Sequence, residues 1–247
     1  MVASHRTSPL PRIEVRSGIE GRTGAAGRPS AALWVTGALV ATALLLWLAV
    51  TVAGHPGPLG IDVGVLDGFL RVRTSAVTVA AKVIAVLTDP AATAGVVVAA
   101  ALWLLLRSKD RAGAVFLICS SVATAVLLEA AKLMVGRPRP PIALQLMPES
   151  NNSFPSGHVT GVVAVFGALA LVAVVRGVRR SLVVACWATL VVVVVLDRLY
   201  LGVHWFSDIV GALLLGTAIL LAAAAVAHRV LAPGQPAELL RGNGLDR

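Results

Sequence analysis

The sequence predicts an all-α, polytopic membrane protein with six transmembrane helices in one bundle. Of the 247 residues, 57% are hydrophobic and only 13% are charged, and the mean hydropathy is +0.88. Uncharged runs long enough to cross a bilayer recur along the chain, whereas a soluble domain of this length does not need them. Although the formal net charge is +9, the cations lie in short clusters between the apolar runs. This distribution is typical of membrane topology signals and argues against a nucleic-acid partner.

The first predicted span follows a polar tail. Residues 1–30 are rich in Arg, Gly, Ser and Pro and lack hydrophobic periodicity, so we expect a disordered cytoplasmic tail. Residues 31–53 then form an uncharged run of 23 residues. A cleaved signal peptide is the alternative, but its apolar core has roughly 7 to 15 residues. The length therefore favours a retained helix.

The second span is predicted at residues 90–106. Asp89 is suited to cap this helix and Pro90 to occupy its first position. Before it, residues 61–75 mix charged and apolar side chains and are expected to lie along the membrane interface. Residues 74–87 are apolar except for Lys82, and the sequence leaves open whether they form a separate half-helix or a kinked extension of the second span.

Four more apolar runs complete the predicted bundle. Residues 136–152, between the third and fourth spans, are polar and proline-rich and are expected to form a loop. Trp205 is placed to act as an interfacial anchor of the last span. One domain is thus expected over 31–230, followed by a second cytoplasmic tail at 231–247. The remaining spans are predicted at residues 112–132, 159–175, 181–196 and 205–227.

The distribution of cations predicts the orientation. With six alternating spans and the N-terminus inside, the inside segments hold 14 of the 21 Lys and Arg residues, which indicates that both termini are cytoplasmic. Four of the other seven lie at the outer ends of the third and fifth spans, where the topology rule would not place them, so they need another explanation. The seven are Arg71, Arg73, Lys82, Lys132, Arg137, Arg139 and Arg198.

A histidine and an aspartate stand at the mouth of the last span. His204 and Asp208 are four residues apart and therefore share a face if the helix includes both. Asp208 could then orient the imidazole of His204 and stabilise its positive form, as in the nucleophile–orienter part of a catalytic arrangement. The alternative is a histidine and an acid that merely flank a membrane helix.

Two further motifs are suited to an anion. Lys132, Arg137 and Arg139 supply a point charge and planar guanidinium forks in a proline-stiffened segment. Alternatively, Lys132 pairs with Glu129 and the arginines bind lipid headgroups.

The other motif is Pro155-Ser156-Gly157-His158, directly before the fourth span. A helix start exposes backbone N–H groups to an anion, and His158 could donate a proton beside it. An ordinary helix cap with an interfacial histidine is the alternative. By the six-span count all three motifs lie at the outer face, and together they fit a phosphoryl group, whose transfer depends mainly on positioning and charge stabilisation.

These residues resemble the three signatures of the type 2 phosphatidic acid phosphatase superfamily. Lys132, six residues and Arg139-Pro140 resemble the first signature, and Pro155 to His158 match the second. Arg198, five residues, His204, three residues and Asp208 match the third. The resemblance covers residues 90–230. It departs at Asp197, where the family usually has serine, and we expect this carboxylate to turn aside from the pocket towards Arg137 or Arg71.

The resemblance implies a mechanism. His204 would attack phosphorus and become a phosphohistidine, Asp208 would orient it, and His158 would protonate the leaving oxygen. Arg137 would be an additional phosphate contact. The resemblance implies neither a metal nor another cofactor. The remaining phosphate-binding residues would be Lys132, Arg139, Arg198, Ser156 and Gly157.

The expected function is an integral-membrane hydrolase, acting on a lipid phosphate or polyprenyl diphosphate at the outer leaflet of the cell membrane. The candidate substrates are undecaprenyl diphosphate, phosphatidic acid and phosphatidylglycerol phosphate. Soluble head-group phosphates are an alternative substrate class. The alternatives are a phosphoryl or head-group transferase on the same scaffold and a non-catalytic lipid-binding protein. A haloperoxidase is disfavoured because such relatives are soluble, and a transporter because no inverted repeat is visible. The oligomeric state is left open.

Overall fold

The computed structural model describes residues 31–55 and 57–231, so the predicted tails at 1–30 and 232–247 lie outside the described residues. The described part is entirely helical apart from loops and turns. A π-helical turn at Val162–Phe166 joins α6 to α7, and a 3₁₀ turn lies at Ile142–Leu144. The α-helices are α1 (Ala31–Ala53), α2 (Gly60–Arg71), α3 (Ser75–Leu87), α4 (Pro90–Leu106), α5 (Arg111–Val135), α6 (Gly157–Gly161), α7 (Gly167–Val175), α8 (Arg180–Tyr200) and α9 (Phe206–Val230).

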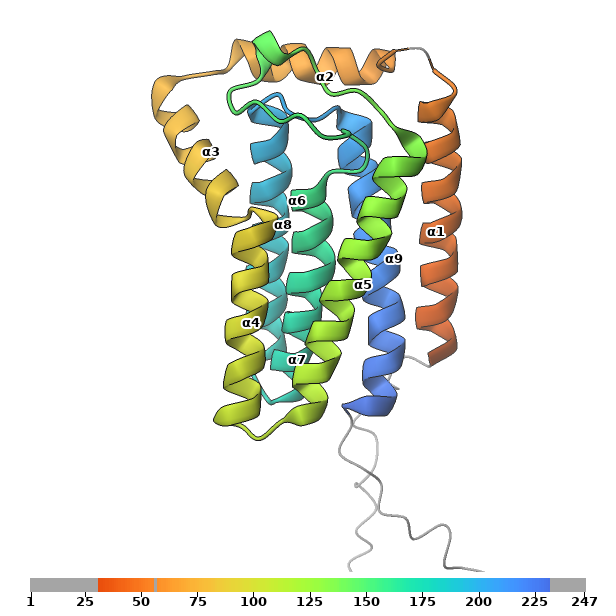
Figure 1. Ribbon diagram of the computed structural model, residues 1–247, viewed down its shortest axis with the longest axis vertical. Coiled ribbons are helices and arrows are strands. Elements are labelled where there is room, and N and C mark those ends of the chain that lie inside the picture. Colours follow the sequence, from red (N-terminus) through yellow and green to blue (C-terminus); the bar gives the residue numbers. More distant parts are fainter. Residues whose placement is uncertain (1–30, 56, 232–247) are drawn as a thin grey trace, which may run out of the picture.

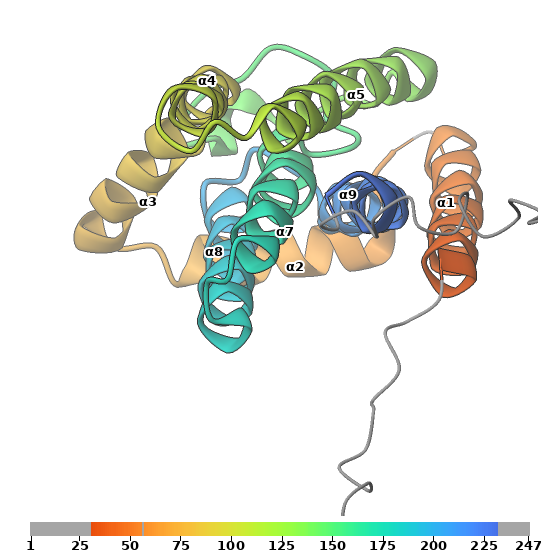
Figure 2. The same ribbon diagram turned by 90° about the horizontal axis from the view of Figure 1, so that it is seen from below.

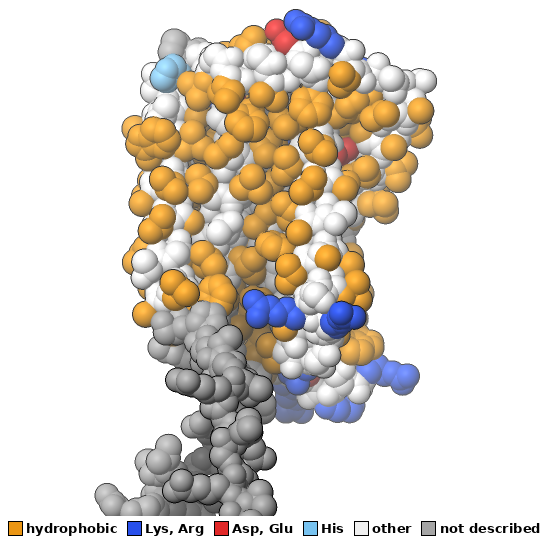
Figure 3. Space-filling view, turned by 180° about the vertical axis from the view of Figure 1, so that it is seen from behind, with side chains coloured by type: hydrophobic (Ala, Val, Ile, Leu, Met, Phe, Trp, Pro, Cys, Tyr) orange, Lys and Arg blue, Asp and Glu red, His pale blue; other side chains and the backbone are white. Residues whose placement is uncertain are grey.

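The helices are those of a multi-pass membrane protein. Five helical runs, namely α1, α5, the α6–α7 run, α8 and α9, are long and apolar enough to cross a bilayer. Helices α3 and α4 pass the same test together and are bent by 50° at their junction. With this pair counted as one bent span, residues 31–55 and 57–231 contain six candidate spans, the number that the sequence predicts. The space-filling view shows a broad apolar belt, with Lys and Arg gathered towards the two ends (Figure 3).

The bend between α3 and α4 follows from the local sequence. The Thr88 hydroxyl donates to the carbonyl of Ile84 at 2.8 Å, and the Asp89 carboxylate accepts the Ala91 N–H at 2.8 Å. Pro90, at the first position of α4, has no N–H with which to continue α3. Residues 75–87 are therefore a separate helix, which answers the question that the sequence left open, and the predicted cap at Asp89 is confirmed.

One end of the bundle carries additional structure. Helix α2 lies across this end, roughly at right angles to the spans, and the loop between α5 and α6 covers the same end (Figure 1). Helix α1 packs mainly against α9 at the edge of the bundle, as the view along the spans also shows (Figure 2). Gly211 of α9 lets the loop approach closely, because a Cβ there would lie 2.4 Å from the ring of buried Phe154.

Trp205 is not an interfacial anchor, contrary to the prediction. Its side chain is buried, its Nε1–H donates to the carbonyl of Pro138 at 2.9 Å, and the Arg137 guanidinium lies 5.8 Å from the ring centroid. The indole therefore packs under the α5–α6 loop and supports it.

Candidate active site

The structure brings the three sequence motifs together at the end of the bundle covered by α2. Each motif lies at a helix end or in a loop: Lys132 in the last turn of α5, His158 in the first turn of α6, and Arg198 in the last turn of α8. Arg139 lies in the α5–α6 loop, and His204 in the loop between α8 and α9. Side chains more than 60 residues apart in the chain are thereby within hydrogen-bond distance of one another.

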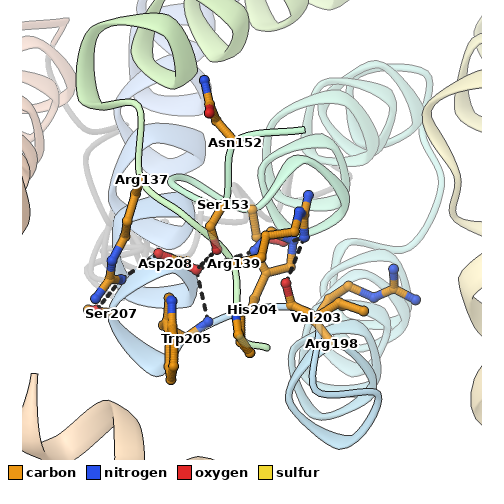
Figure 4. Close-up of polar contacts among 12 residues, drawn as sticks. Arg137, Arg139, Asn152, Ser153, Arg198, Val203, His204, Trp205, Ser207 and Asp208 are labelled. Carbon is orange, nitrogen blue, oxygen red and sulfur yellow. Dashed lines mark hydrogen bonds and ion pairs between the residues drawn. The ribbon is translucent and has the colours of Figure 1, made fainter. Parts of the chain in front are cut away.

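His204 is completely enclosed and lies between an acid and an arginine. Its Nδ1 is 3.4 Å from Oδ2 of Asp208, and its Nε2 is 3.1 Å from Nη1 of Arg139 (Figure 4). The Nδ1 contact is longer than an ordinary hydrogen bond, and Nδ1 has no other partner among the described residues. Burial lowers the pKa of His204, the Asp208 contact opposes this, and the Arg139 charge lowers it further. The imidazole is therefore neutral at pH 7, with Nε2 towards the arginine.

Asp208 is fixed by three donors besides the histidine. Its Oδ1 accepts from Nη1 of Arg137 at 2.6 Å. Its Oδ2 accepts the Trp205 N–H at 2.8 Å and the hydroxyl of Ser153. Because the carboxylate is fully buried, these bonds determine where it presents its charge to His204.

Arg137 is a partner of Asp208 and not an additional phosphate contact. Besides Asp208 it donates to Oδ2 of Asp62 at 2.7 Å and to the hydroxyl of Ser207 at 2.7 Å. Asp62, on α2, is also completely buried and accepts the Ser207 N–H at 2.8 Å. No sequence signal distinguishes Asp62, because residues 61–75 as a whole are expected to lie along the interface. A buried line of charges thus runs from Asp62 through Arg137 and Asp208 to His204.

The α5–α6 loop holds the other cations. Nζ of Lys132 donates to the carbonyl of Asn152 at 2.8 Å, and it forms no ion pair with Glu129 among the described residues. Arg139 donates through Nη1 to the carbonyl of Val203 at 2.7 Å, and through Nε to that of Asn151 at 2.8 Å. The arginine thereby ties the loop to the segment that carries His204.

Arg198 is oriented by its neighbour in sequence. Its Nε and Nη2 donate to Oδ2 of Asp197 at 2.9 and 2.5 Å, while Nη1 lies 3.2 Å from Nε2 of His158. The expectation that Asp197 turns towards Arg137 or Arg71 is therefore wrong, since Arg137 is occupied by two other carboxylates. Asp197 holds one edge of the guanidinium and leaves the other edge facing His158.

The Ser156–His158 turn lies next to Arg198. The main-chain N–H of Ser156 donates to the carbonyl of Asp208 at 3.3 Å, so this donor is already used, whereas its buried Oγ has no partner among the described residues. Nε2 of His158 lies 3.3 Å from the carbonyl of Ala85 at the end of α3. Gly157 lines the cavity above.

Part of this site lines a cavity of about 850 Å³, whereas Ser156, His204 and Asp208 are buried behind its wall and do not line it. Its polar wall contains Lys132, Arg139, His158, Arg198 and Glu149. An apolar groove of about 530 Å³ between α4 and α5 shares Pro90, Ala125, Leu128 and Gly157 with it. Within residues 31–55 and 57–231, no three His, Cys, Asp or Glu side chains are grouped so that they could hold a metal ion.

Comparison with known proteins agrees with this geometry. The family model of the PAP2 superfamily matches residues 113–231. The fold is similar to the crystal structure of a transmembrane PAP2-type phosphatidylglycerolphosphate phosphatase from Bacillus subtilis, with a TM-score of 0.73 and 20% sequence identity, over 78% of this chain and 97% of that chain. No curated protein matches the sequence. The three signatures, their convergence and the family match have one conclusion: through residues 113–231, the chain belongs to the PAP2 superfamily.

Proposed function

We propose that the protein is a membrane-embedded phosphatase that hydrolyses a lipid phosphate or diphosphate through a phosphohistidine intermediate. The observation that carries the proposal is the position of His204, whose Nε2 lies 3.1 Å from Arg139 while its Nδ1 faces Asp208. A neutral imidazole with Nδ1–H towards a carboxylate has its lone pair on Nε2, which is the arrangement of a nucleophile.

The reaction would proceed in two displacements. Nε2 of His204 attacks phosphorus, the bond from phosphorus to the leaving oxygen breaks, and that oxygen takes a proton from His158. Water then attacks the phosphohistidine and passes a proton to His158, the bond from phosphorus to Nε2 breaks, inorganic phosphate leaves, and His204 returns to its neutral form. In both steps Asp208 stabilises the positive charge that develops on the imidazole.

The phosphate oxygens would be held by Lys132, Arg139 and Arg198, with the Ser156 hydroxyl and the Gly157 N–H as further donors. Both arginines are anchored by the protein, Arg139 by the carbonyls of Asn151 and Val203 and Arg198 by Asp197. Such anchoring lowers the cost of reorganisation when charge accumulates in the transition state.

A lipid substrate is supported by the apolar groove between α4 and α5, which adjoins the polar cavity at four shared lining residues. A phosphate in the cavity and a hydrocarbon chain in the groove would satisfy both surfaces. The cation count supports an orientation with this end of the bundle at the outer leaflet and both termini in the cytoplasm.

The proposal is tested with purified protein in detergent, using a polyprenyl diphosphate and phosphatidic acid as substrates with EDTA present. We expect phosphate release without added metal, and none above background from His204→Ala. Turnover by that variant would reject His204 as the nucleophile, and strict dependence on a metal would reject the chemistry.

The orientation needs a separate experiment. Gln145→Cys, in a Cys119→Ala/Cys186→Ala background, places a reporter in the α5–α6 loop, and an impermeant thiol reagent should label it from outside intact cells. Labelling only after the cytoplasmic face is opened would reverse the proposed orientation.

A further inference from the structure

A carboxylate already lies among the cations of the cavity. Glu149, in the α5–α6 loop, places Oε2 2.6 Å from Nη2 of Arg139 and Oε1 3.3 Å from Nη1 of Arg198. The two arginine side chains are 5% and 1% exposed, respectively. The two oxygens of one carboxylate thus bridge two buried guanidinium groups.

The donors that Glu149 occupies are those that the proposed reaction needs. The guanidinium of Arg139 also contacts Nε2 of His204, and Nη1 of Arg198 also contacts Nε2 of His158. A phosphoryl group between the two histidines would present its oxygens to the same two guanidinium edges. The carboxylate and a phosphate cannot occupy these donors together.

The side chain can leave without rebuilding the loop. The loop backbone is anchored separately, since the Glu149 N–H donates to the side-chain oxygen of Gln145 at 3.0 Å, and the Gln145 amide donates to the carbonyl of Pro140 at 2.7 Å. The Glu149 side chain is 26% exposed, so rotation about its own bonds can carry the carboxylate towards solvent.

We propose that Glu149 determines specificity, because it is an internal competitor that an incoming anion must displace. The inference rests on the proposed function and names the substrate class that it favours. A terminal phosphate carries about −1.5 to −2 charge and three acceptor oxygens. It therefore has both more negative charge and more acceptor oxygens than the carboxylate. A phosphodiester headgroup carries a single charge and two unesterified oxygens, so it gains little from the exchange. Glu149 therefore admits terminal phosphates and excludes the phosphodiester lipids that surround the site.

A second glutamate provides the matched control. Glu129 lines the same cavity from α5 but forms no ion pair among the described residues. Neutralising it changes the net charge near the cavity by the same amount without removing a carboxylate from the arginines. A general charge effect would appear in both variants, whereas displacement would appear only at Glu149.

The test compares Glu149→Gln, Glu129→Gln and the wild-type chain in detergent. Orthovanadate binding is measured by calorimetry, and inhibition of phosphatidic acid hydrolysis by phosphatidylglycerol is measured in mixed micelles. We expect Glu149→Gln to bind orthovanadate about tenfold more tightly, which corresponds to ~1.4 kcal/mol. We also expect phosphatidylglycerol to inhibit this variant and not the other two proteins.

Unchanged or weaker orthovanadate binding by Glu149→Gln would overturn the inference, since the carboxylate would then only hold the arginines in place. If that variant does not yield folded protein, Glu149→Asp replaces it, because the shorter side chain cannot bridge both arginines, and about threefold tighter binding is expected from a partial loss of the contact. Orthovanadate binding does not require turnover. A wild-type chain that hydrolyses no phosphate would therefore refute the proposed function alone, while the comparison of variants still decides the role of Glu149.

Discussion

The two ends of the bundle contain the same kinds of charged residue but use them differently. At the end away from α2, the cations of the two loops are mostly exposed, and among the described residues the ion pair there joins Arg176 to Asp110. At the site end, Arg137, Arg198, Asp62 and Asp208 are buried and each is bonded to an opposite charge. Exposed cations suffice as a topology signal, whereas buried and paired charges indicate a preorganised site. Burial distinguishes the two sets, since composition does not.

The largest expected effect tests the pairing at the centre of the site. Asp208→Asn retains the shape but removes the charge that faces His204. We expect kcat to fall by roughly 10⁴-fold, the loss that the same change of the orienting carboxylate causes in a serine–histidine–aspartate triad. Single-turnover kinetics would measure this, and retained orthovanadate binding would show that the site is intact. A fall of less than tenfold would mean that Asp208 does not orient the nucleophile.

The next effect tests whether α2 belongs to the site. Asp62→Asn should leave Arg137 with a weaker partner and disturb Asp208, so we expect kcat to fall about tenfold with KM nearly unchanged, by loss of one charged hydrogen bond. Asp67→Asn is the control, since Asp67 lies on the same helix and is exposed. A change in KM alone, or equal effects of both variants, would contradict a positioning role for Asp62.

The pH dependence of the reaction tests the burial of His204. Because burial, reinforced by the Arg139 charge, lowers the pKa of His204 below 6.5, the neutral nucleophile persists as the pH falls through that value. After correction for ionisation of the substrate, the acid limb of kcat/KM should lie below pH 6.5. A limb at or above pH 6.5 would indicate that His204 is not shielded in this way.

The smallest effect is expected at the other end. Arg176 is 43% exposed, and its ion pair with Asp110 is distant from the cavity. Arg176→Gln should change kcat/KM by less than about twofold and the free energy of unfolding by less than about 1 kcal/mol. A loss of activity comparable to that of Asp62→Asn would mean that the two ends are coupled.

The sequence predicted most of the spans and the clustering of the signature residues, because apolar runs and fixed spacings are local signals. The Asp89-Pro90 helix start is an example, since a cap and a proline act within one turn. Residues whose role depends on tertiary contacts could not be predicted. Asp62 looks like any polar residue of an amphipathic helix, and its partner Arg137 is 75 residues away. Glu149 lies in a loop without periodicity, although its position among the signature cations was a signal. Asp197 was expected to turn away, but its nearest cation in space is also its neighbour in sequence.

Helix α2 lies outside residues 113–231, which match the family model, yet its Asp62 forms the far end of the buried line of charges. During synthesis, Asp62 emerges well before Arg137, and Arg137 well before Asp208. The Asp62 carboxylate therefore cannot be enclosed until α5 and α9 have been inserted, because Arg137 follows α5 and Asp208 lies on α9. Nascent chains truncated before the last span should consequently leave Asp62 accessible to carboxyl-directed labelling, and full-length insertion should close it off.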